Sequence, residues 1–221
     1  MKYLLGVGVV LFLVGCGKEA EHHGKTVSQW RQAVQDPSPT VRSEAADSLG
    51  AIGSQAKSAV PDLIVALQAK DDGVRAKAAT ALWSISREAK EAVPALTAAL
   101  KDKKADVRLC AAGALGEIGP DGREAIPALA QTLKDKDPKV RYQAANSLTK
   151  FGAEAKVAVP ALAAALKDSN AAVRIEVAYA LAAIGPEAAG AIPDLNKMLK
   201  EKDGRIRGAA KYALRKIQAK E

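Results

Sequence analysis

The sequence has little of the side-chain chemistry that enzymes most often use. Only two histidines occur among its 221 residues, the adjacent His22 and His23, so the rest of the chain lacks the commonest general base. The pair has no further ligands at the spacing of a metal site. No segment alternates convincingly like a strand, and no glycine-rich phosphate loop follows one. We therefore expect no catalytic residues, no metal, no cofactor and no enzymatic activity.

Cysteine and aromatic residues are also scarce. The two cysteines are Cys16 and Cys110, and aromatic residues make up 4% of the chain. Cys16 ends an apolar N-terminal run, which leaves Cys110 without a partner for an internal disulfide. Few aromatic residues and much alanine favour close-packed helices over a sheet. The fold must then be held together by packing.

The N-terminus has the pattern of an export signal. Lys2 precedes an apolar run at residues 4–14, which is shorter than the roughly 20 residues needed to span a bilayer. The run ends in Leu13, Val14, Gly15 and Cys16, which resembles the lipobox of bacterial lipoproteins. That resemblance implies cleavage after residue 15, a lipid on the Cys16 thiol, and an exported protein anchored to the cell membrane or outer membrane. An ordinary secretory signal with an incidental cysteine is the alternative.

Residues 16–25 follow the signal as a polar stretch with two glycines and no apolar periodicity. We expect this stretch to be a flexible tether between the lipid and the folded part, residues 26–221.

Three landmarks then recur every 33 residues without insertion or deletion, which indicates a repeat array. A proline follows Val or Ile at Pro61, Pro94, Pro127, Pro160 and Pro193. A leucine recurs at Leu49, Leu82, Leu115, Leu148, Leu181 and Leu214. An arginine follows Val, or Ile in the last unit, at Arg42, Arg75, Arg108, Arg141, Arg174 and Arg207.

Each unit has the pattern of two helices. In the second unit Pro61 opens the first helix and Asp71 can cap the second. An apolar stripe at helical spacing follows, and Gly53 shows the glycine expected just past such a helix in most units. The stretch AVPALTAALKDKKADVRLCAAGALGEIG at residues 92–119 resembles a HEAT repeat of the short, phycobilisome-lyase-like kind. The resemblance implies an all-α, right-handed α-solenoid of six two-helix repeats, a fold used mostly as an interaction scaffold.

The repeated arginines suggest a structural ladder or a phosphate-binding row. Each arginine lies in the first turn of a helix, where a positive charge is unfavourable and must be offset. An acid lies six residues before it in five units, and HEAT repeats use such a pairing as a ladder, so we favour the structural role. The pairs are Asp36 and Arg42, Asp102 and Arg108, Asp135 and Arg141, Asp168 and Arg174, and Glu201 and Arg207. Ala69 breaks the pattern in the second unit, where Asp71 or Asp72 could substitute.

Positions that escape the periodicity are the better candidates for function. On the second helix of each unit, one face away from the apolar stripe holds large side chains. The resemblance to HEAT repeats implies that this helix lines the concave surface, so these side chains would line the groove. They are Trp83, Leu109, Tyr142, Ile175, Tyr179 and Tyr212. Exposed apolar residues of this kind mark interaction sites. Burial of the same side chains by strong superhelical curvature is the alternative. Cys110 shares a different column with charged residues, so we expect an inert thiol that leans toward solvent.

The last unit concentrates positive charge. Residues 197–221 hold nine Lys or Arg against three acids, or +6 of the formal net charge of +8. Lys211, Arg215 and Lys216 form the candidate basic patch, which is either a solvated end cap or a contact for an anionic partner. We expect a monomeric, membrane-tethered scaffold that presents its groove to an envelope protein or peptide, with no nucleic-acid partner. The alternative is a structural envelope protein whose basic end contacts anionic polymer or lipid.

Overall fold

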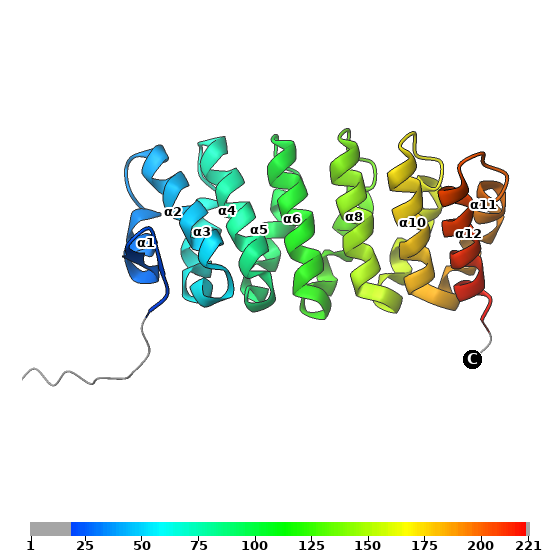
Figure 1. The fold of residues 1–221 in the computed structure, drawn as a ribbon, viewed down its shortest axis with the longest axis horizontal. Helices are drawn as coiled ribbons and strands as arrows, with labels where there is room; N and C mark the ends of the chain where they lie inside the picture. The colour runs from blue at the N-terminus through cyan, green and yellow to red at the C-terminus, as the bar shows by residue number, and fades with distance from the viewer. Residues whose placement is uncertain (1–18, 220–221) are drawn as a thin grey trace, which may run out of the picture.

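The computed structural model describes residues 19–219, and the expected signal segment and Cys16 lie outside them (Figure 1). Six short helices alternate with six long ones, as expected for six two-helix repeats. The short helices are α1 (Val27–Ala33), α3 (Val60–Ala66), α5 (Val93–Ala99), α7 (Ile126–Thr132), α9 (Val159–Ala165) and α11 (Ile192–Met198). The long helices are α2 (Pro39–Ile52), α4 (Asp72–Ile85), α6 (Ala105–Ile118), α8 (Pro138–Phe151), α10 (Ala171–Ile184) and α12 (Gly204–Ile217).

Turns of 3-10 helix lead from each long helix to the next short one. They are η1 (Gly53–Ala59), η2 (Ser86–Glu88), η3 (Lys90–Ala92), η4 (Gly119–Ala125), η5 (Gly152–Ala158) and η6 (Gly185–Ala191). Four of them begin at a glycine with positive φ, such as Gly53 at 69°, which is the expected way to end the preceding helix. The caps agree with the sequence as well: the Asp71 carboxylate accepts a hydrogen bond from the Val74 N–H at 3.0 Å.

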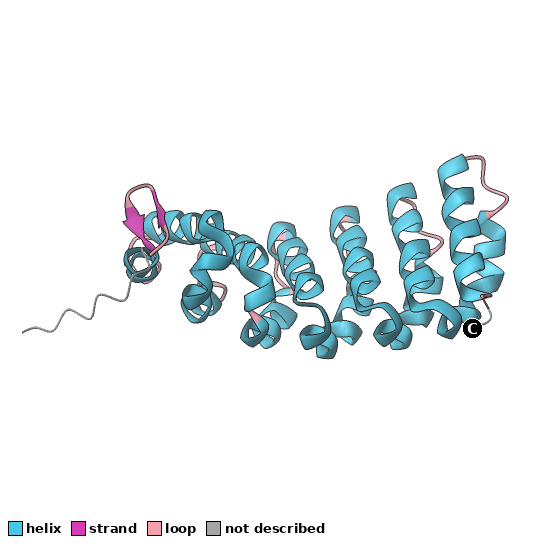
Figure 2. Cartoon of the chain, turned by 60° about the horizontal axis from the view of Figure 1, so that its bottom comes forward, coloured by secondary structure: helices cyan, strands magenta, loops and turns pink. Residues whose placement is uncertain are grey.

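The units stack side by side into one solenoid (Figure 1). Each long helix packs directly against the long helices of the units before and after it, whereas short helices of adjacent units barely touch. This unequal spacing bends the stack, and Figure 2 shows the long helices on the inner side of a shallow arc with the short helices outside. The periodic leucines, such as Leu82 and Leu115, are fully buried between the two rows and form one continuous core. The predicted all-α solenoid of six repeats is therefore confirmed.

The described part of the expected tether (residues 16–25) contains regular secondary structure, which a flexible tether would not have. Strands β1 (Glu21–His22) and β2 (Lys25–Thr26) pair antiparallel and form a small hairpin just before α1. Trp30 takes the place of a core leucine, is 1% exposed, and donates a hydrogen bond from Nε1 to the His22 carbonyl at 3.0 Å. The Lys25 ammonium lies 4.2 Å from the centre of the Trp30 ring. These contacts fix the hairpin to the first unit, which the polar composition of the segment did not suggest.

One described stretch, Ala171–Met198, is apolar and long enough by composition to cross a membrane. It comprises α10, η6 and α11, and half of its most apolar window is buried against the rest of the array. Its apolar character is accounted for by the core of the solenoid.

Candidate interaction surfaces

The repeated arginines join each unit to the next one. In the three central pairs the Arg Nε lies 2.6 to 2.7 Å from Oδ2 of an aspartate 27 residues later, and all six side chains are largely buried. We call these pairs the ladder; they are Arg75 with Asp102, Arg108 with Asp135, and Arg141 with Asp168. Nη2 donates to the second carboxylate oxygen in each, which gives a two-pronged contact.

The sequence analysis paired each arginine with the acid six residues before it, and for the ladder arginines that prediction was wrong. The residue six positions before the arginine contributes its backbone carbonyl: Arg108 Nη1 donates to the Asp102 carbonyl at 2.8 Å. The Asp102 carboxylate instead accepts from Arg75 of the preceding unit. Neither proposed substitute for the missing acid at Ala69 serves, because Asp71 caps its own helix and Asp72 pairs with Lys104.

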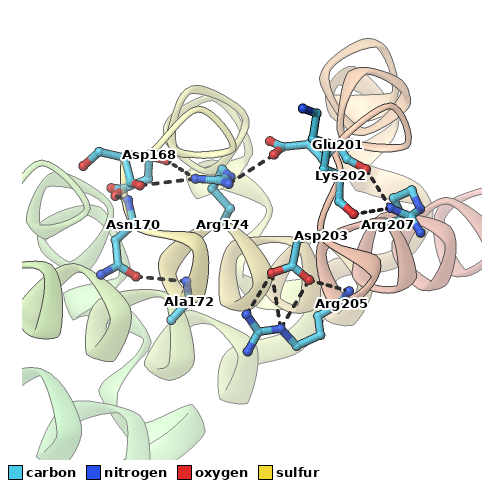
Figure 3. A network of polar contacts seen from close by, with 10 residues as sticks. Asp168, Asn170, Ala172, Arg174, Glu201, Lys202, Asp203, Arg205 and Arg207 are labelled. Atoms are coloured by element: carbon cyan, nitrogen blue, oxygen red, sulfur yellow. Dashed lines mark hydrogen bonds and ion pairs between the residues drawn. The ribbon is translucent and has the colours of Figure 1, made fainter.

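The ladder weakens toward both ends of the array. Arg174 meets Glu201 only through Nη2, at 3.3 Å, and its buried Nε has no partner in the part of the chain that the structure describes (Figure 3). Within residues 19–219, Arg42 and Arg207 have no carboxylate partner, and each donates only to two backbone carbonyls. Four of the six arginines therefore bridge units, and three of these four do so with good geometry.

Ionisation of the ladder aspartates is favoured despite their burial. Burial alone would raise the pKa of Asp135, but hydrogen bonds from Arg108 and from the Asp137 backbone N–H outweigh it and leave the pKa below its ordinary value of 3.8. The pKa values of Asp102 and Asp168 are lowered by the same balance. The ladder is thus a row of true ion pairs at neutral pH.

The candidate groove residues lie on the long helices, and none is fully buried. Tyr142, Tyr179 and Tyr212 are 38%, 40% and 39% exposed, and the other three, Trp83, Leu109 and Ile175, are intermediate. Tyr179 and Tyr212 meet edge to face with ring centroids 5.8 Å apart. The structure therefore places a row of accessible tyrosines along the last three long helices, with the apolar side chains of the earlier units more covered.

Trp83 is held by a glycine of the next unit. A Cβ built on Gly113 would lie 2.5 Å from Cε2 of the indole, so no larger residue fits while the ring stays in place. The Trp83 side chain borders a shallow cavity of about 320 Å³ shared with Thr80, Arg87 and Glu117. The absence of a side chain at Gly113 is what lets the ring cross to the neighbouring helix.

A second row of contacts between long helices escaped the sequence analysis. Residues 30 apart meet across adjacent long helices: Asp47 with Lys77 at 2.7 Å, Thr80 with Cys110 at 3.4 Å, and Asn146 with Glu176 at 2.9 Å. Cys110 is therefore buried and does not lean toward solvent as expected, and burial raises the pKa of its thiol. Glu176 is buried too, and its charge is the main cause of a raised pKa for Tyr142 on the groove.

The basic patch lies on α12, the last long helix. Lys211, Arg215 and Lys216 are exposed, and none forms an ion pair with another residue of the described chain. The Arg215 guanidinium and the Lys216 ammonium lie 5.6 and 5.9 Å from the centre of the Tyr212 ring. The patch therefore adjoins the tyrosine row. Among residues 19–219 no cluster of three or more potential metal ligands occurs.

Comparison with known proteins agrees with this architecture. An engineered protein of known structure is similar, with a TM-score of 0.69, 28% identity, and coverage of 87% of this chain and 96% of that one. A designed armadillo repeat protein in complex with peptide (KR)4 gives a TM-score of 0.75 at 18% identity, covering 88% of this chain and 100% of that one. The complex of CpcE and CpcF of phycocyanin lyase from Nostoc sp. PCC7120 gives 0.62 at 31% identity, covering 72% and 65%.

Among curated proteins no sequence matches the chain. The family described as HEAT repeats matches residues 18–83, 60–135, 93–159 and 126–215, which together span nearly the whole described chain. The protein therefore belongs to the HEAT-repeat family.

Proposed function

We propose that this protein is a membrane-tethered scaffold of the bacterial envelope that binds a protein or peptide on its concave face. The observation that supports this proposal is the tyrosine row, Tyr142, Tyr179 and Tyr212. These side chains are about two-fifths exposed and belong to the long helices, which form the inner side of the arc (Figure 2). The periodic packing of the solenoid does not require these side chains, since the equivalent positions of the first unit are Ser43 and Asp47.

Tyrosine suits such a surface because it offers a large contact area and a hydroxyl while losing little conformational entropy. Successive tyrosines come from adjacent units, so an extended segment laid across the long helices would meet one ring after another. The related solved structures support a protein partner by analogy: the designed armadillo repeat protein holds a peptide, and CpcE forms a complex with CpcF.

The groove is tested by crosslinking in cells followed by identification of the bound protein. Combined Tyr142→Ala and Tyr179→Ala should reduce the yield of the crosslinked partner at least about tenfold, as expected when interface anchors are removed. The control replaces an exposed valine that lies outside both the long helices and the tyrosine row, Val157→Ala, and should leave the yield unchanged. Equal loss in both variants would contradict a role for the tyrosine row.

The tether is a separate part of the proposal and rests on the lipobox resemblance at residues 13–16. Cys16→Ser should abolish metabolic labelling with a fatty acid and release the protein from the membrane fraction, because the anchor is the lipid. Cys110→Ser is the control and should do neither. Membrane retention of the Cys16→Ser protein after a high-salt wash would exclude the lipid anchor.

A second candidate function follows from the basic patch. Lys211, Arg215 and Lys216 project from the end of the array without acidic partners among residues 19–219, as a contact for anionic polymer or lipid would require. The unaltered protein should bind anionic vesicles, and this binding should weaken steeply with added salt. Replacing all three residues by Gln should abolish it. The control removes three exposed lysines elsewhere, at Lys57, Lys90 and Lys156, with the same loss of charge. Equal loss in the two variants would show net charge, not the patch, to be responsible.

A further inference from the structure

The junction between the first and second units contains a cavity. It has a volume of about 760 Å³. Val34 and Gln35 at the end of α1, Arg42 of α2, Val65 of α3, and Ala69 and Lys70 after α3 line it. The cavity is open to solvent.

Comparison with the ladder shows that this junction lacks an aspartate that the central junctions have. At Arg75, Arg108 and Arg141, an aspartate 27 residues later accepts from both Nε and Nη2 of the guanidinium. For Arg42 the residue 27 positions later is Ala69, whose methyl group accepts nothing.

Nη1 of Arg42 nevertheless makes the same backbone contacts as in the other units. Its Nη1 donates to the carbonyls of Asp36 and Pro37 at 2.7 and 2.8 Å, the contacts that orient every arginine of the series. Its Nε and Nη2 have no hydrogen-bond partner among residues 19–219, and residues 1–18 contain no acidic side chain. The two nitrogens that bind a carboxylate in the central units are therefore oriented but have no acidic partner within residues 19–219.

The charges around the cavity favour an anion. Lys70 adds a second cation to Arg42 at the wall. The acid among the lining residues, Asp62, is already engaged, because its two oxygens accept from Arg31 Nε at 2.6 Å and Gln35 Nε2 at 2.9 Å. Val34, Val65 and Ala66 supply an apolar wall beside the charged one.

We propose that this cavity binds a carboxylate group on a short apolar stem, which takes the place that an aspartate side chain occupies in the central units. The guanidinium fork of Arg42 holds the two oxygens, and the valine side chains contact the stem. The site is independent of the tyrosine row, which lies on the long helices, and of the tether. Its ligand is either a small free carboxylate or an acidic residue of a partner peptide.

The direct test is an NMR titration of the arginine Nε–H resonances of the full chain at constant ionic strength. Propionate should shift the Arg42 resonance saturably, with half-saturation on the order of 10 mM for one charge-assisted pair. Propionamide, the neutral analogue of the same shape, should not. A blocked aspartate, with both backbone ends capped, tests the peptide source: half-saturation at lower concentration than propionate assigns the ligand to a peptide, and the reverse assigns it to a small acid.

Two controls come from the molecule itself. Arg207 also lacks an acidic partner among residues 19–219, and no described unit packs beyond α12, so its resonance should respond weakly and without saturation. Ala69→Asp should place a carboxylate in the cavity from within the chain. This variant should lose the propionate response and raise the unfolding midpoint by about 2–4 °C.

A response at Arg42 no stronger than at Arg207 would overturn the proposal. So would a saturable response that persists undiminished in Ala69→Asp. Arg42→Gln provides a check that does not depend on the added aspartate. If propionate causes the same saturable shifts at the Val65 and Lys70 resonances of this variant, Arg42 does not hold the carboxylate and the proposal fails.

Discussion

Nε of Arg108 lies 2.6 Å from Oδ2 of Asp135, and Nη2 lies 2.8 Å from Oδ1, so two side chains 27 residues apart form one two-pronged contact between adjacent units. Both side chains are about nine-tenths buried. Both charges lose solvation when the pair is buried, so the intact pair adds little net stability. Removing one partner costs much more, because it leaves a buried charge uncompensated.

Asp135→Asn should therefore destabilise the protein by about 3 kcal/mol, near the lower end of the range for removing one partner of a buried pair. Denaturant unfolding at pH 7 measures the change. Asp36 offers a matched control, because it occupies the same place in the first unit but its carboxylate accepts, among residues 19–219, only from the Ser38 N–H. Asp36→Asn should cost less than about 0.5 kcal/mol. Equal losses would show that the contact between units is not the cause.

Stability should fall in acid because of the ladder aspartates. The pKa values of these aspartates are lower in the folded protein than in the unfolded chain, where they are about 3.9. Their ionised forms therefore stabilise the fold above that pH, and the stabilisation is lost as the pH falls through their pKa values in the folded protein. Urea unfolding should give a nearly constant free energy from pH 7 to about pH 5 and a decline below about pH 4. Asp135→Asn should decline less steeply. A free energy of unfolding independent of pH down to 3 would contradict this account.

The weak contact between Arg174 and Glu201 should improve with a shorter acid. Glutamate reaches only Nη2, at 3.3 Å, and leaves the buried Nε unpaired. Glu201→Asp should let both nitrogens donate and should stabilise the protein by about 1 kcal/mol. The reciprocal change Asp168→Glu, in the preceding unit, should destabilise by a similar amount. Thermal and denaturant unfolding of the two variants should therefore shift in opposite directions.

Gly113→Ala should displace the Trp83 ring. The new methyl group would fall 2.5 Å from the indole, and the strain should exceed the gain in helix propensity, for a net loss of about 1–2 kcal/mol. The Trp83 indole N–H resonance should move as well. Gly208→Ala, also within a long helix but with no atom within 4 Å of the new Cβ, should instead stabilise by up to about 1 kcal/mol. A stabilised Gly113→Ala variant would mean that the ring is not held there.

Cys110 should react slowly with thiol reagents in the folded protein. Its thiol is buried against Thr80, and burial raises its pKa, so little thiolate is available. In a Cys16→Ser background, reaction with an aromatic disulfide at pH 8 should be at least about 100-fold slower than in denaturant. The added thiol of Ser84→Cys, at an exposed site on the same chain, should react at the rate of a free thiol. Fast reaction of Cys110 would place it at the surface.

The repeat period alone was enough to predict the helices, their caps and the buried leucines, because each depends on residues within one unit. The identity of the ladder partners was not accessible in the same way. An acid at position 135 is six residues from Arg141 and 27 from Arg108, and only the stacking of the units decides which arginine receives its carboxylate.

The burial of Cys110 and Glu176 escaped prediction for a related reason. Seen on one helix, both belong to a face away from the apolar stripe, but the long helices lie so close together that this face meets the preceding unit. A spacing of 30 between complementary residues, such as Asp47 with Lys77, is the signal that could have revealed the second row.

The uneven quality of the ladder has a mechanical consequence. The three complete pairs bind units two to five through buried ion pairs, while the first and last units are joined to this block by ion pairs that are more exposed, such as Arg31 with Asp62 and Arg174 with Glu201, and that contribute less. Bending and fraying will concentrate at those two joints. The central units should therefore move as one rigid body while the two terminal units flex. The ends of the solenoid can then adjust to the shape of a bound partner, whereas the middle cannot.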